Sequence, residues 1–175
     1  MYPQEYIEYL VHFHGDRDYF ECHEILEEYW KKGIDKNKNS ILVAFILLAV
    51  SNYHHRRGNF SGASRTLSKA LTIFSNKEQE LPQYGYEANK FLKLLEERLE
   101  VIRQFKTYKS MNLPIQDTVL IDTCRQACKQ KNLIWCGESD IEREDIVHKH
   151  KKRDRRSVVL ERENALRTKH NKPSV

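Results

Sequence analysis

The run ILVAFILLAV at residues 41–50 constrains the fold more than any other feature of the chain. Ten apolar residues in a row are too few to cross a bilayer, which needs about 20. The helix-compatible segment around the run extends from about Ser40 to Arg57, and Gly58 follows it as a typical residue after a helix end. Its apolar residues fall nearly all round the helix, so we expect this helix to be central in a helical bundle.

The remaining sequence favours an all-α protein. The six glycines and four prolines stand near the ends of predicted helices and do not follow a strand-and-turn rhythm. We therefore predict a compact bundle of five or six helices with a charged C-terminal helical extension. Besides the central helix, we predict helices over residues 3–14, about 18–32 (capped by Asp16 or Asp18), about 59–74 (capped by Asn59 or Ser61), about 86–108, and a shorter one after Asp117.

The predicted bundle domain covers residues 1–137, and residues 138–175 form a charged tail. From about Asp140 to Lys169 the chain is polar and poor in apolar residues, so we expect this helix to project or to be partly disordered. Its basic run HKHKKRDRRS, residues 148–157, suits contact with phosphates. A solvated helix with acidic neighbours three or four residues away is the alternative. Without interleaved aromatic residues, any nucleic-acid binding would be non-specific and salt-sensitive.

Several functional classes are disfavoured by the sequence. It has no glycine-rich phosphate loop, no dinucleotide-binding fingerprint and no G-x-S-x-G nucleophile elbow. A net charge of +5 does not by itself indicate nucleic acid as a partner. The acidic N-terminus lacks the basic start and long apolar stretch of a signal peptide, so we expect a cytoplasmic protein with reduced thiols. A homodimer is compatible with the sequence.

Three of the four cysteines offer a weak metal-binding pattern. Cys124 and Cys128 are one helical turn apart, and Cys136 follows. A zinc site would need Cys136 and a tail histidine such as His148 as the second pair of ligands. Buried free thiols are the other interpretation.

The segment YFECHEILEEYW, residues 19–30, predicts a helix with two polar residues in its apolar arc. His23 and Glu27 fall four residues apart between Phe20 and Trp30, whereas Glu24 falls near the opposite side. Burial of such a pair is costly unless partners exist. The arc consists of Tyr19, Phe20, Cys22, Ile25, Leu26, Tyr29 and Trp30.

An antiparallel hairpin of this helix and the central helix would bring His54 near His23 and Glu27. Two imidazoles and a carboxylate can bind a divalent transition metal such as zinc, iron or manganese. Without metal, the trio His23, Glu27 and His54 could act as a general acid–base cluster, with Trp30 and Tyr53 as walls. The alternative is a purely structural hydrogen-bonded pair that fixes helix packing.

Two motifs in order resemble the domain of unknown function 309 family. They are YFECHEILEEYWK, with an aromatic pair, H-E-x-x-E and a tryptophan, and AFILLAVSNYHHRRGNFSGASRTLSKAL, with an aromatic–His step, Gly-Asn and Gly-Ala. The resemblance covers about residues 5–105 and implies an all-α fold without an assigned activity. It points to Phe20, His23, Glu24, Glu27, Trp30, His54, Gly58, Asn59, Gly62 and Ala63.

Two functional hypotheses follow from these observations. The first is a small polar site between the second and third helices, hydrolytic and metal-assisted. Its catalytic and metal-binding residues would be His23, Glu27 and His54, and its binding residues Phe20, Glu24, Trp30, Tyr53 and Asn59. The second is a non-enzymatic interaction protein that binds a partner or nucleic acid through its basic tail, with a purely structural His/Glu cluster.

Overall fold

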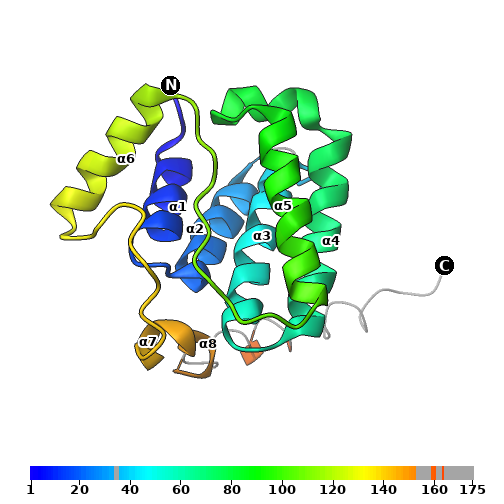
Figure 1. Cartoon of the computed structure of the whole chain (residues 1–175). Helices are drawn as coiled ribbons and strands as arrows, with labels where there is room; N and C mark the ends of the chain where they lie inside the picture. The colour runs from blue at the N-terminus through cyan, green and yellow to red at the C-terminus, as the bar shows by residue number, and fades with distance from the viewer. Residues whose placement is uncertain (34–35, 153–158, 161–162, 164–175) are drawn as a thin grey trace.

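Helix α3 (Ile41–Arg56) lies at the centre of the computed structural model, as its apolar run predicts (Figure 1). Helix α2 (Tyr19–Lys32) packs against it on one side and helix α4 (Phe60–Asn76) on another. Buried residues of α3 lie on several of its faces, because neighbouring helices surround it. They include Ala44, Phe45, Ile46, Leu48, Ala49, Ser51 and Asn52.

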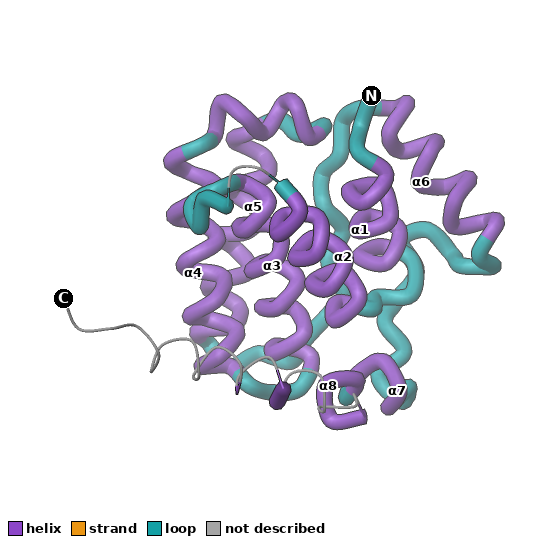
Figure 2. Tube along the Cα trace, turned by 180° about the vertical axis from the view of Figure 1, so that it is seen from behind, coloured by secondary structure: helices purple, strands orange, loops and turns teal. Residues whose placement is uncertain are grey.

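The structure describes residues 1–33, 36–152, 159–160 and 163, and these residues confirm the predicted all-α fold (Figure 2). Helix α1 packs on α2, helix α5 packs on α4, and helix α6 lies against α1. A short 3-10 helix, η1, precedes α5, and two single turns, α7 and α8, follow α6 in the tail. The bounds are α1 (Gln4–His14), η1 (Glu78–Tyr84), α5 (Ala88–Arg103), α6 (Thr118–Gln130), α7 (Glu144–Val147) and α8 (Lys149–Lys152).

The described helices are too short or too polar to cross a membrane. This agrees with the length argument made for residues 41–50.

Side-chain caps fix where the helices of the site begin. Asp18, and not Asp16, caps α2: its Oδ1 accepts a hydrogen bond from the Glu21 backbone N–H at 2.9 Å. Asn59, and not Ser61, caps α4 by accepting from the Gly62 N–H at 2.9 Å. A Cβ atom at Gly62 would lie 2.7 Å from Asn59 Nδ2, which explains the glycine at that position.

The chain departs from the sequence prediction in two segments. The fifth helix ends at Arg103, five residues before the predicted Tyr108, and Phe105 then takes a positive φ of 54°. From about Asp140 we predicted a helix that projects or is partly disordered. Through Lys152 the chain forms the two single turns α7 and α8 beside the bundle (Figure 1). Ile146 and Val147 are buried, so this part does not project. The remainder, residues 153–158, 161–162 and 164–169, lies outside the described residues, and the domain boundary after residue 137 stays a prediction.

A fully buried arginine joins segments that are distant in the sequence. Arg17 donates hydrogen bonds to the carbonyl oxygens of Phe13 at 3.0 Å, Met111 at 2.7 Å and Gly137 at 2.9 Å. It also donates to Asn112 Oδ1 at 2.6 Å. Each of these acceptors is a neutral oxygen, so Arg17 acts as a hydrogen-bond hub and not as half of an ion pair.

We expect Arg17→Met to lower the free energy of unfolding by about 3 kcal/mol or more, because it leaves several buried carbonyl groups without a donor. Arg125→Met is the matched control, since Arg125 is exposed on α6. That change should stay within about 0.5 kcal/mol. Urea denaturation measures both, and a similar small loss in the two variants would contradict the assignment.

His14 is one of two buried histidines among the described residues, the other being His55. Its Nδ1 donates to the Leu10 carbonyl oxygen at 3.0 Å, and its Nε2 accepts from the Leu113 N–H at 3.0 Å. Burial lowers the pKa of His14 from 6.5 to about 3, so the ring is neutral in the folded protein. This ring ties α1 to the segment that leads into α6.

The lowered pKa of His14 predicts a loss of stability in mild acid. The unfolded chain takes up a proton below about pH 6.5 while the folded chain does not, so stability falls as pH drops from 6.5 towards 3. Between pH 7 and pH 5 the unfolding free energy of the native protein should fall by about 2 kcal/mol more than that of His14→Gln. Parallel pH profiles of the two proteins in urea denaturation would refute this.

Candidate functional site

A pocket of about 200 Å³ lies between α2, the end of α3 and α8. Aromatic and basic side chains and one valine line it: Tyr19, Phe20, His23, Val50, Tyr53, His54, Arg57 and His150.

A larger hollow, of about 320 Å³, lies between α5 and the segment that follows it. Its lining includes Leu94, Glu97 and Val101 but no histidine or aromatic residue. Of these two, the pocket between α2 and α3 carries the side chains suited to proton transfer, metal binding or ring stacking.

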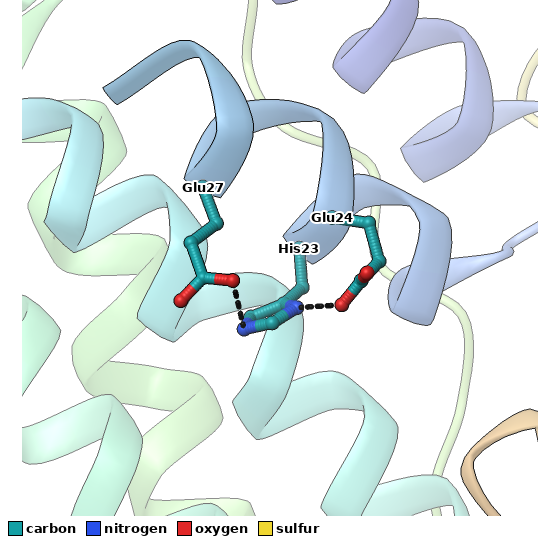
Figure 3. A group of neighbouring side chains, drawn as sticks. All are labelled: His23, Glu24 and Glu27. Atoms are coloured by element: carbon teal, nitrogen blue, oxygen red, sulfur yellow. Dashed lines mark hydrogen bonds and ion pairs between the residues drawn. The ribbon is translucent and has the colours of Figure 1, made fainter. Parts of the chain in front are cut away.

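His23 lies between two carboxylates of its own helix, as Figure 3 shows. Its Nδ1 is 3.0 Å from Glu24 Oε1, and its Nε2 is 4.0 Å from Glu27 Oε2. Glu27 Oε2 also forms an ion pair with Lys31 Nζ at 3.2 Å. One ligand atom each from His23, Glu24 and Glu27 lie within 4.8 Å of one another, so these three residues form the candidate metal group.

The structure corrects the predicted burial of the polar pair. The buried stripe of α2 consists of Tyr19, Cys22 and Leu26, which is narrower than the apolar arc read from the sequence. The side chains of His23 and Glu27 are 28% and 35% exposed, because they lie at the edge of that stripe. Both side chains therefore keep part of their contact with solvent, and their desolvation costs less free energy than full burial would.

His54 lines the same pocket as His23 but does not belong to the group with Glu24 and Glu27. Its Nδ1 is 3.1 Å from Asn59 Nδ2, so the cap of α4 also orients this ring. Partial burial lowers the pKa of His54, and the positive charges of Arg57 and Arg65 lower it further. His54 is therefore neutral near pH 7.

Of the two predicted walls, Tyr53 lines the pocket and Trp30 does not. The ring of Tyr53 lies beside that of Phe20, with 6.0 Å between the ring centroids. Trp30 lies towards the other end of α2, where its Nε1 donates to the Asn37 carbonyl oxygen at 3.2 Å. Trp30 lines a separate hollow with Tyr29 and Leu42.

The tail supplies residues that sequence reasoning missed. Tyr53 Oη is 2.6 Å from His150 Nδ1 and accepts from the His150 backbone N–H at 3.1 Å. Arg57 Nε donates to His148 Nδ1 at 3.3 Å. Nothing in the sequence pointed to these contacts, because they join residues 97 and 91 positions apart.

Lys149 anchors this part of the tail to the start of α2. Its Nζ forms ion pairs with Asp18 Oδ2 at 2.7 Å and Glu21 Oε2 at 2.8 Å. These contacts occupy the described half of the basic run that was a candidate for nucleic-acid binding. Residues 153–157 of that run lie outside the described residues, so nucleic-acid binding stays a prediction.

The cysteines and His148 do not come together. His148 contacts Arg57, whereas Cys124 and Cys128 are buried on α6 against α1. Burial raises the pKa of Cys124 to about 12 and that of Cys128 to about 11. These protonated, buried thiols fit the free-thiol interpretation, since zinc binds the thiolate form.

The comparisons with known proteins agree with the motifs. The family described as "Domain of unknown function (DUF309)" matches residues 6–66. The "Uncharacterized protein YpuF" of Bacillus subtilis (strain 168) is 42% identical over 166 residues, which cover 95% of each chain. The chain belongs to the DUF309 family. No solved structure matches it.

In this DUF309 protein the family match includes α1, α2, α3 and the start of α4. It therefore contains His23, Glu24, Glu27, His54 and Arg57. His150 lies outside the match, although the alignment with YpuF is long enough to include most of the tail.

We expect Lys149→Gln to loosen α8, because the substitution removes both ion pairs to the start of α2. Two partly exposed pairs are worth about 1 kcal/mol together, or about a fivefold change in opening. Hydrogen exchange of the amides of residues 149–152 should accelerate by that factor. Lys32→Gln, which breaks only the exposed pair with Glu28, is the control and should leave these amides unchanged. Equal exchange rates in all three proteins would contradict this role.

Proposed function

We propose that His23, Glu24 and Glu27 bind a divalent transition-metal ion at the edge of the pocket, and that the site hydrolyses a small molecule held there. The observation that carries this proposal is the distance of at most 4.8 Å between ligand atoms of three residues in little more than one helical turn. An imidazole nitrogen and two carboxylate oxygens are common ligands of zinc, iron and manganese. Three protein ligands leave coordination positions open.

The position of His23 supports the link between the ion and the pocket. His23 belongs both to the metal group and to the pocket lining. A metal ion there would act as a Lewis acid on a substrate oxygen and would lower the pKa of bound water. Phe20 and Tyr53 would shield the substrate from bulk water.

His54 is the candidate general acid–base group in this proposal. It lines the pocket opposite α2, and Asn59 orients its ring. A neutral imidazole near pH 7 can accept a proton. We retain a cytoplasmic location as part of the proposal, which the free thiols of all four cysteines support.

The test is the metal content of tag-free protein purified without chelator, measured by mass spectrometry. We expect about one equivalent of a transition metal in the native protein and its loss in His23→Ala and Glu27→Gln, because three ligands are the fewest that hold such an ion tightly. Glu28→Gln is the matched control: Glu28 is the next residue on α2, and within the described part of the chain its ion pair is with Lys32. It should retain the metal.

The structural alternative gives a different result. If the cluster only supports packing, the native protein stays empty when zinc or manganese is added. His23→Ala then lowers the free energy of unfolding by about 1–3 kcal/mol, because Glu24 and Glu27 lose the ring that they contact. That combination would reject the metal site.

A further inference from the structure

The end of α3 carries a positive charge that the described residues do not neutralise. Arg57 Nε donates to His148 Nδ1 at 3.3 Å, and the guanidinium carbon lies 5.3 Å from the centroid of the Tyr53 ring. Neither partner is an anion. Within the described residues, no carboxylate lies in ion-pair distance of Arg57, and its two Nη groups have no hydrogen-bond acceptor.

The nearby carboxylates are already engaged with other cations. Glu27 pairs with Lys31, and Lys149 Nζ pairs with Asp18 and Glu21. Glu24 holds the His23 ring. No carboxylate is among the lining residues of the pocket, whereas Arg57, His54 and His150 are. Arg57 is therefore the lining residue that carries a permanent charge.

The positive charge of Arg57 lies close to the His54 ring. The pKa of His54 is lowered by its burial and then by Arg57 and Arg65. An anion beside Arg57 would oppose the effect of Arg57 on His54.

The remaining walls are apolar and aromatic. Phe20, Val50 and Tyr53 line the same space as Arg57. Arg57 at the end of α3 would also interact favourably with the helix dipole, which explains a cation at this place. The dipole does not explain why the cation faces a pocket with aromatic walls.

We propose that this pocket binds a small organic oxyanion, with its charged group on Arg57 and its apolar part against Phe20, Val50 and Tyr53. The guanidinium group suits this role because it presents paired N–H donors to two oxygens of a phosphate or carboxylate. A volume of about 200 Å³ limits the apolar part to about one ring. The inference goes beyond the metal site, because none of the four contacts named here needs a bound cation.

The test is a titration of the full chain, kept in chelator, with four probes followed by NMR. The probes are phenyl phosphate, benzoate, inorganic phosphate and phenol. We expect saturable shifts of the Tyr53 and His54 resonances with at least one of the two aromatic anions. Inorganic phosphate and phenol should bind at least about tenfold more weakly, since each lacks one of the two recognised parts. The preferred aromatic anion identifies the charged group as phosphate or carboxylate.

Three variants decide whether Arg57 makes the contact. Arg57→Gln should weaken binding of the preferred anion at least about tenfold, because it removes a charged hydrogen bond. Arg57→Lys keeps the charge and should retain part of the affinity. Arg125→Gln removes an exposed arginine on α6 and should bind as the native protein does. Thermal melting curves of all three check that they are folded.

The outcomes separate this inference from the metal proposal. In chelator, Glu27→Gln should bind the anion at least as tightly as the native protein, because it removes a neighbouring negative charge, whether or not the native protein is purified with a metal. Binding of the anion that is unchanged in Arg57→Gln would overturn the inference. So would the lack of saturable binding by both aromatic anions.

Discussion

The buried guanidinium group of Arg17 is the interaction on which the functional end of the molecule depends. It binds carbonyl groups of α1, of the segment before α6 and of the segment after α6. The carbonyl oxygen of Arg17 in turn accepts a hydrogen bond from Arg56 Nη1 at 2.7 Å, which connects this hub to the end of α3. The next residue, Asp18, both caps α2 and pairs with Lys149. The start of α2, the end of α3 and the tail are thus held together through two consecutive residues.

Local sequence rules were sufficient for the helices themselves. The apolar run of residues 41–50 made α3 central, and short polar side chains marked the starts of α2 and α4. These features depend on a few neighbouring residues, so a single sequence reveals them. The end of α5 was overestimated, because residues 104–108 are compatible with a helix and only tertiary contacts, such as the bond from His55 Nε2 to the Lys106 carbonyl oxygen, favour the turn.

The site was only partly predictable, because it combines contacts at short and long separation in the sequence. The spacing of His23 and Glu27 placed them on one helix face, and the hairpin argument placed His54 on the same pocket. Glu24 was named as a binding residue but not as a metal ligand, because a helical wheel follows backbone directions, whereas a glutamate side chain can bend around the helix to His23. The tail contacts join residues about 90–130 positions apart, which no periodicity encodes.

His23 separates two environments of opposite charge. Glu24 lies at its Nδ1 and Glu27 at its Nε2, and His23 also lines the pocket with Arg57 and His150. A cation held by the carboxylates and an oxyanion held by Arg57 would therefore meet at His23, each offsetting the charge that disfavours the other. The carboxylates of Glu24 and Glu27 would by themselves repel an anion bound at Arg57 and weaken its binding. A cation bound by these carboxylates would remove that repulsion. Binding of the two ligands would then be coupled, and by linkage each would raise the affinity of the other by the same factor.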